Sequence, residues 1–413
     1  MKPQKHLVLE SHSLLLFFTL FVLYAVVYMT KNMYSSAMAV IVEQGVMTKS
    51  QTGFINAVYW FIYGIFQFVG GFITDKSSPF KVVTIGVAGA ALANIIISIN
   101  QNYYVMLAAW AFNGMIQFGV WPGIFKIIST QTDSSVRGPA VLWISLSSSL
   151  GLGMSMLVAS FVKRWQNNFS ISAIVLLVIL AIFIVVYRRL EKEMVEDTVE
   201  RKKASDTPTE KAPMLPLLFS TGLIALIGAS FFRFTVENGI KLMTPVMLME
   251  SYENLPAAIS TRMSAVLVIF TIGGLFIARY ARKKIKYETS AMKLFGLLAV
   301  PGLAFACFVG RVHYIWILVA LSYVTIVLCA TSPFAATYIS TRFEKQGRIG
   351  TVTGVINGAA SLGNILASYV FAKMAELVPW EWVTASWLAF DLIFVLLCVI
   401  VAPRWKRFVD GNE

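Results

Sequence analysis

The composition of this 413-residue chain excludes an ordinary soluble domain. Hydrophobic residues make up 57% of the sequence and charged residues only 13%, whereas soluble domains are about one quarter charged. The formal net charge is +13 at pH 7 and the mean hydropathy is +0.72. These values predict an integral membrane protein.

The polar and reactive residues predict no metal site, no cofactor and no enzyme active site. The three cysteines, Cys307, Cys329 and Cys398, lie inside apolar runs, where a thiol behaves as a small hydrophobic group. The sequence has no phosphate-binding glycine loop of the nucleotide-binding type, no zinc-ligand spacing and no His/Ser/Asp constellation. We therefore expect a protein that is not an enzyme.

The apolar segments, taken in chain order, predict twelve membrane-spanning helices. Each is about as long as a helix that crosses the hydrocarbon layer, and only helices can pair all backbone groups of an isolated span in lipid. The first run is too long for a cleaved signal peptide, so we expect it to be retained. The predicted spans are 13–40, 52–74, 80–100, 103–128, 138–162, 168–188, 215–240, 257–279, 289–310, 314–338, 349–374 and 382–402.

Lysine and arginine gather on one set of the loops between these spans, for example at Lys81, Arg188, Lys283 and Arg404. This asymmetry predicts that both termini are cytoplasmic and that the chain is a multi-pass protein of the plasma (inner) membrane. It also explains most of the positive net charge. We therefore expect membrane lipid as a partner and no nucleic acid.

A polar stretch, 188–213, divides the spans six and six. We expect an N-terminal half at 1–187, a flexible cytoplasmic linker at 188–213 and a C-terminal half at 214–413. The segment 67–81 after span two is echoed by 270–284 after span eight, and such parallel repeats are typical of transporters. A chain of this kind can enclose its own cavity, so we expect a monomer.

The echo between the two segments is incomplete. Asp75 lies four residues after Gly71, while the same step from Gly274 reaches Ala278. The pattern therefore predicts an acidic latch at this position only in the first half.

Several motifs carry a family resemblance. The segment GGFITDKSSPFK, residues 70–81, resembles the cytoplasmic loop motif of the major facilitator superfamily. The segments NGMIQFGVWPG (113–123), SSVRGPAV (134–141) and TKNMYSSAMAVIVEQG (30–45) are similar to the organophosphate:phosphate antiporter family. That family includes the bacterial glycerol-3-phosphate and hexose-6-phosphate carriers. The resemblance implies the all-α major facilitator fold. In the second half it rests mainly on Arg233.

Two cations inside the predicted spans are candidate substrate-binding residues. An ionised group at the bilayer centre costs roughly 2.5 to 3.5 kcal/mol on insertion scales and normally faces a water-filled cavity. By the repeat, Lys31 and Arg233 would lie at similar depth on corresponding helices and face one central cavity that binds an anion. The alternatives are that Lys31 extends to the outer interface and that Arg233 is paired internally with Glu237, one turn away.

The resemblance implies two arginines, in spans one and seven, that bind the substrate phosphate. A guanidinium suits this role because it donates two parallel hydrogen bonds to a tetrahedral oxyanion. Arg233 matches the span-seven arginine, but Thr30 stands at the span-one position. Gln67 replaces a lysine and Ser148 replaces a histidine, while Tyr63 fits the family. With Lys31 and Glu237, these residues form the predicted substrate-binding set.

Buried carboxylates leave alternatives open. Glu237 could exchange partners when a substrate or a proton arrives, or it could form a permanent salt bridge with Arg233 or Lys241. For Asp391, in the last predicted span, we expect a structural hydrogen bond.

A second predicted set controls conformational change rather than binding. Asp75, at the cytoplasmic end of span two, would pair with a loop cation such as Arg137 in one state and release it in the other. Gly71 and Lys76 belong to the same gating motif.

The sequence as a whole predicts a secondary active transporter of a small organic anion. The resemblance implies a sugar or polyol phosphate exchanged for inorganic phosphate by alternating access. The alternatives are a proton-coupled symporter of an organic monoanion and a membrane sensor of a phosphorylated sugar that does not transport.

Overall fold

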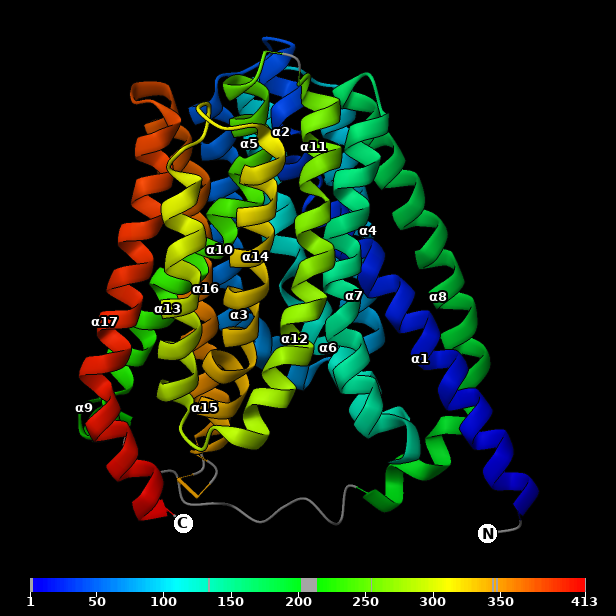
Figure 1. The fold of residues 1–413 in the computed structure, drawn as a ribbon. Coiled ribbons are helices and arrows are strands. Elements are labelled where there is room, and N and C mark those ends of the chain that lie inside the picture. The colour runs from blue at the N-terminus through cyan, green and yellow to red at the C-terminus, as the bar shows by residue number, and fades with distance from the viewer. Residues whose placement is uncertain are drawn as a thin grey trace. The chain divides into compact units, whose positions relative to one another are not determined.

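The structure is a computed structural model that describes residues 3–132, 134–201, 214–253, 255–343, 345–346 and 348–412. Every regular element in these residues is helical (Figure 1). The chain forms two compact units. Unit 1 comprises the described residues up to Ala37 and from Phe61 to the end of helix α8. Unit 2 comprises Met38–Trp60 and helices α9 to α17. Helices α2 and α3 therefore contribute to both units.

Unit 1 is built around α1 and α4. Helix α1 packs against α7 and α8, and α4 packs against α5, α6 and α8. Large apolar side chains such as Leu20, Val87, Ile124 and Phe183 are fully buried between these helices. The elements from the start of the chain to α8 are α1 Pro3–Lys31, α2 Met33–Glu43, α3 Lys49–Lys76, α4 Pro79–Ser98, α5 Tyr103–Ile116, the 3₁₀ turn η1 Gln117–Gly119, α6 Val120–Gln131, α7 Ser134–Phe161 and α8 Trp165–Arg201.

Unit 2 is built around α10, which packs against α16, α17 and α14. Helix α14 also packs against α12 and α13. The remaining elements are α9 Met214–Ser220, α10 Leu223–Ser251, α11 Ala257–Ser264, α12 Val266–Lys284, α13 Glu288–Ala306, α14 Tyr314–Pro333, the π turn η2 Phe334–Tyr338, α15 Ile339–Thr341, α16 Ile349–Leu377 and α17 Trp380–Asn412.

The helix ends follow local chemistry. Pro79 begins α4, where its missing N–H costs nothing. Asn102 caps α5, because its Oδ1 accepts hydrogen bonds from the backbone N–H groups of Tyr104 and Val105 at 2.9 and 3.3 Å. Gly222 precedes α10 with φ of 75°, a left-handed conformation that favours glycine.

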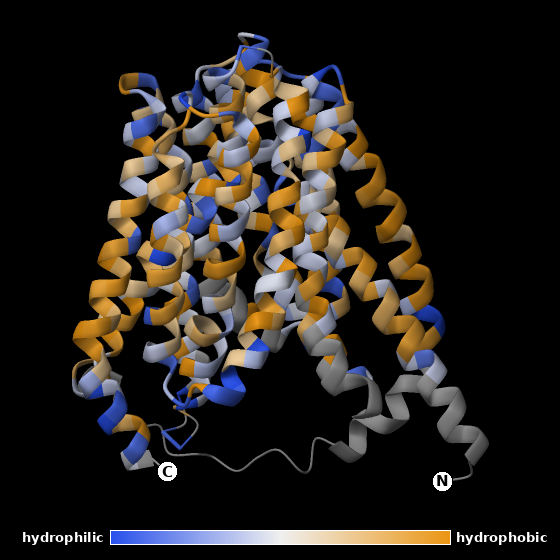
Figure 2. Cartoon of the chain, in the orientation of Figure 1, coloured by the Kyte–Doolittle hydropathy of each residue, from blue (hydrophilic) through white to orange (hydrophobic). Residues whose placement is uncertain are grey.

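Nine helical segments within the described residues are long and apolar enough to cross a membrane. Figure 2 shows such apolar residues along α8 and α17. The other three predicted spans, 52–74, 103–128 and 138–162, also fall on helices, but they are not among the nine. The count of twelve spans and the cytoplasmic position of the termini stay predictions.

Three predicted segments differ from the structure. The predicted span 215–240 falls on two helices, because α9 ends at Ser220 and α10 begins only at Leu223, after Gly222. Helix α8 continues to Arg201, so the first part of the predicted flexible linker is helical. Its residues are mostly good helix formers such as Glu, Lys, Met and Arg. The predicted single helix 103–128 is interrupted by η1, within the motif NGMIQFGVWPG. The cause is local, because Pro122 has no N–H to donate to the carbonyl of Phe118.

Candidate functional site

The charged face of α10 forms the main candidate site. Arg233, Glu237 and Lys241 are spaced four residues apart, so they lie on one face of the helix, one turn after another. The helix is also packed closely at Gly239, where an added Cβ would lie 2.5 Å from a ring carbon of Phe371. This close packing holds α10 in place and so fixes the position of the charged stripe.

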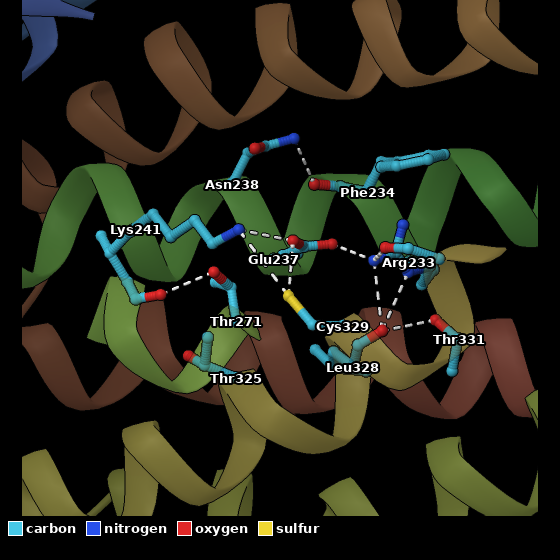
Figure 3. Close-up of polar contacts among 12 residues, drawn as sticks. Arg233, Phe234, Glu237, Asn238, Lys241, Thr271, Thr325, Leu328, Cys329 and Thr331 are labelled. Atoms are coloured by element: carbon cyan, nitrogen blue, oxygen red, sulfur yellow. Dashed lines mark hydrogen bonds and ion pairs between the residues drawn. The ribbon is translucent and has the colours of Figure 1, made fainter. Parts of the chain in front are cut away.

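Arg233 is completely buried and is held by several acceptors (Figure 3). Its Nη2 donates to a carboxylate oxygen of Glu237, to the carbonyl oxygen of Leu328 at 3.1 Å and to the hydroxyl of Ser332. The guanidinium also lies 4.2 Å from the centroid of the Phe234 ring. Its Nη1 has no hydrogen-bond partner among the described residues. The Nη1 group of this fixed guanidinium is therefore buried without an acceptor in the described part of the structure.

Glu237 bridges two cations. Its Oε2 accepts from Arg233, and its Oε1 accepts from Nζ of Lys241 at 2.5 Å and from the thiol of Cys329 at 3.0 Å. The Glu237 side chain is 9% exposed and that of Lys241 is 14% exposed. A carboxylate removed from water requires such partners, because an unpaired buried charge is costly. The predicted pairing of Glu237 with Arg233 or Lys241 thus occurs with both at once.

Proline shapes the two helices that meet at this cluster. Pro245 cannot donate to the carbonyl of Lys241, and Pro333 cannot donate to the carbonyl of Cys329. The π turn η2 follows Pro333 directly, and such turns often occur at functional sites. The backbone is therefore irregular next to residues that hold the charges.

Sequence reasoning missed part of this cluster. It named Lys241 only as a salt-bridge partner, and it interpreted Cys329 only as a small apolar residue of a span. It did not identify Ser332 or the carbonyl of Leu328 at all. The signal for Lys241 was present in the sequence as the continued four-residue spacing after Glu237. The α14 residues gave only one signal, the Ser332–Pro333 pair inside an apolar helix.

Unit 1 carries the other predicted cation. Lys31 is 5% exposed, and its Nζ lies 3.5 Å from the ring centroid of Tyr63 and 5.3 Å from that of Tyr28. Helix α1 ends at Lys31, and Asn32 donates a side-chain hydrogen bond to the carbonyl of Tyr28 at 2.8 Å. Lys31 and Tyr63, both predicted from the sequence, are thus brought together against an aromatic surface.

Thr30 and Ser148 also lie in unit 1. Thr30 is fully buried, and its hydroxyl donates to the carbonyl of Val27 at 3.0 Å. The hydroxyl hydrogen therefore forms a hydrogen bond within α1. Ser148 is half-buried on α7.

In the motif at 113–123, Gln117 donates to Oδ1 of Asn113 at 2.6 Å. That bond lies within one turn rather than between helices.

The remaining predicted positions lie outside the described part of the structure. These are the side chains of Gln67, Asp75, Lys76 and Arg137 and the surroundings of Gly71. The role of Gln67 in binding and the gating roles of the other four stay predictions.

Comparisons with known proteins place the chain in a family. The family model of the Major Facilitator Superfamily matches residues 20–368. A probable hexose phosphate transport protein of Chlamydia trachomatis serovar D is 22% identical over 95% of this chain and 90% of its own. The membrane sensor protein UhpC of Salmonella typhimurium is 24% identical over 29% of this chain and 27% of its own.

A solved structure supports the same assignment at the level of the fold. The crystal structure of a D-xylose-proton symporter has a TM-score of 0.71 and 14% sequence identity to this chain. The superposition covers 93% of this chain and 97% of the symporter chain. The chain is thus a multi-pass protein of the plasma membrane in a family of transporters rather than enzymes. It belongs to the major facilitator superfamily.

Proposed function

We propose that the protein is a secondary transporter that exchanges a small organophosphate, a sugar or polyol phosphate, for inorganic phosphate by alternating access. The observation that carries the proposal is Arg233. Its guanidinium is fully buried and fixed by acceptors on α10 and α14, and its Nη1 has no partner in the described residues. A guanidinium edge of this kind suits a phosphate oxygen. The similarity to a probable hexose phosphate transport protein supports the same substrate class.

The remaining parts of the proposal concern topology and the other residues. We propose twelve spans in two halves, cytoplasmic termini and a monomer, in line with the loop charges and the helix at each predicted range. Lys31, Thr30, Tyr63, Gln67 and Ser148 complete the proposed substrate-binding set. The 70–81 motif and Arg137 form the proposed gate.

Two alternatives share this scaffold. One is proton-coupled symport of an organic monoanion, which the two cations and one carboxylate of the α10 cluster, with a net charge of +1, would suit. The other is sensing without transport, which the partial similarity to a membrane sensor supports.

The test is uptake of labelled phosphate into proteoliposomes preloaded with phosphate. The wild type is compared with Arg233→Lys, and Arg279→Lys on the exposed end of α12 is the matched control. We expect exchange without a proton gradient, a loss of tenfold or more in Arg233→Lys and no change in the control. Uptake that requires a proton gradient would favour the symporter, and phosphate binding without uptake would favour the sensor.

A further inference from the structure

The carboxylate of Glu237 occupies the position of an anion between two cations. Each of its oxygens pairs with a different cation of the same helix, Oε2 with Arg233 and Oε1 with Lys241. A substrate phosphate has the same requirement, because its oxygens need positive donors when they leave water. Glu237 therefore competes with a substrate for the same two donors.

The two cations differ in how firmly they are held. Arg233 is fully buried and has acceptors on α14 as well as Glu237. Lys241 is partly exposed, and within the described residues its ammonium contacts Glu237 and, at 3.9 Å, the sulfur of Cys329. Its four-carbon stem also allows the ammonium to move. Lys241 can thus change its acceptor while Arg233 stays in place.

Two other candidate donors to the substrate are already engaged. The ammonium of Lys31 lies 3.5 Å from the centroid of the Tyr63 ring. Thr30 carries no positive charge, and its hydroxyl donates to the carbonyl of Val27. The ammonium of Lys241, two turns from Arg233 on the same face of α10, can supply a second positive charge.

We propose that Lys241 is a second substrate-binding cation, which leaves Glu237 and binds the phosphate group together with Arg233. This inference rests on the proposed function and refines its substrate class to phosphate monoesters, which carry close to two negative charges at neutral pH. Glu237 acts as an internal competitor that the substrate displaces. Lys241 therefore discriminates dianionic phosphate monoesters from monoanions.

The test measures binding of two probes to purified, full-length protein in lipid nanodiscs: inorganic phosphate and the monoanion dimethyl phosphate. The variants are Lys241→Met, Lys241→Arg, Glu237→Gln and Glu237→Gln with Lys241→Met. Lys283→Met, on the exposed end of α12, is the matched control. Calorimetry gives the dissociation constants, and thermal melting shows whether each variant is folded.

We expect Lys241→Met to weaken phosphate binding about tenfold or more, as loss of one charge-assisted hydrogen bond does, and to leave dimethyl phosphate binding unchanged. Lys241→Arg retains the charge and should bind phosphate within a few-fold of the wild type. Glu237→Gln should bind phosphate more tightly than the wild type, because the competing anion is gone. That gain should disappear in the double variant.

The outcomes separate this inference from the proposed function. Phosphate binding by Lys241→Met equal to that of the wild type would overturn the role of Lys241 and leave the transporter proposal intact. Weaker phosphate binding in Glu237→Gln would overturn the competitor role and show that the carboxylate only holds the cluster together. Failure of the folded wild type to bind phosphate at all would overturn the proposed function itself.

Discussion

The ammonium of Lys31 lies 3.5 Å from the centroid of the Tyr63 ring, although the two residues come from different helices of unit 1. A lysine over an aromatic face is attracted by the ring quadrupole, and a desolvated contact of this kind contributes up to about 2 kcal/mol. The contact turns a charge at the end of α1 toward the protein interior. It therefore joins two residues that the sequence predicts for substrate binding.

The ring of Tyr63, rather than its hydroxyl, should carry this contact. Tyr63→Phe keeps the ring, so we expect phosphate exchange and thermal stability close to those of the wild type. Tyr63→Leu removes the ring and should lower exchange several-fold, as loss of about 1 kcal/mol implies. Proteoliposome exchange and thermal melting measure the two effects. Equal behaviour of the Phe and Leu variants would show that the contact contributes nothing.

Local sequence patterns predicted the helices well but not all of their partners. Apolar run length located the long helices, because burial in lipid leaves few other solutions, but it did not predict the breaks between α1 and α2 or between α9 and α10. Helix ends were less predictable, since a helix such as α8 continues past the apolar run wherever the next residues favour helix. The four-residue spacing from Arg233 to Glu237 predicted their common face. It could not reveal that Cys329 and Ser332 would contact this face, because the register between α10 and α14 depends on packing.

The second half also contains an acidic contact that the repeat did not predict. The carboxylate of Glu288, fully buried at the start of α13, accepts from Arg282 at 2.8 Å, from Arg342 at 3.0 Å and from the indole of Trp405 at 2.9 Å. By the repeat, the residue equivalent to Asp75 is Ala278, which is not acidic. Comparing the two repeated segments cannot predict a contact between residues far apart in sequence.

Glu288 should therefore stabilise unit 2. Glu288→Gln leaves two arginines without their carboxylate, and we expect a loss of about 1.5 to 3 kcal/mol, the range for a charged hydrogen bond. Thermal melting in detergent measures the change. Glu381→Gln is the control, because its pair with Arg311 is long, at 3.6 Å, and largely exposed, so it should change stability by less than about 1 kcal/mol. Similar melting of both variants would contradict the prediction.

Close packing of α3 on α16 within unit 2 requires a glycine at position 53. A Cβ added to Gly53 would lie 2.2 Å from the backbone oxygen of Ser368. Near this point, Asn56 donates to the hydroxyl of Ser368 at 2.8 Å. We expect Gly53→Ala to cost about 1 to 3 kcal/mol by overpacking. Gly354→Ala on α16 is the matched control, because an added Cβ there meets no atom within 4 Å. A melting temperature for Gly53→Ala as high as that of the control would show that the helices can separate without cost.

Asp391 differs from its expected role. The sequence predicted a structural hydrogen bond, but the side chain is fully buried in α17 and neither carboxylate oxygen has a partner among the described residues. A buried polar group without a hydrogen bond costs about 1 to 3 kcal/mol by mutational data. Asp391→Leu should therefore raise the melting temperature, while Asp391→Asn, similar in shape and still polar, should stay closer to the wild type.

Transport measurements on the same two variants decide what the carboxyl group does. If Asp391 is only an unsatisfied core residue, Asp391→Leu should exchange phosphate at the wild-type rate, because no residue of the α10 cluster is changed. A stable Asp391→Leu protein that has lost exchange would instead show that the carboxyl group serves transport. A lower melting temperature in Asp391→Leu than in Asp391→Asn would show that the carboxyl group has a stabilising partner, and the prediction would be wrong.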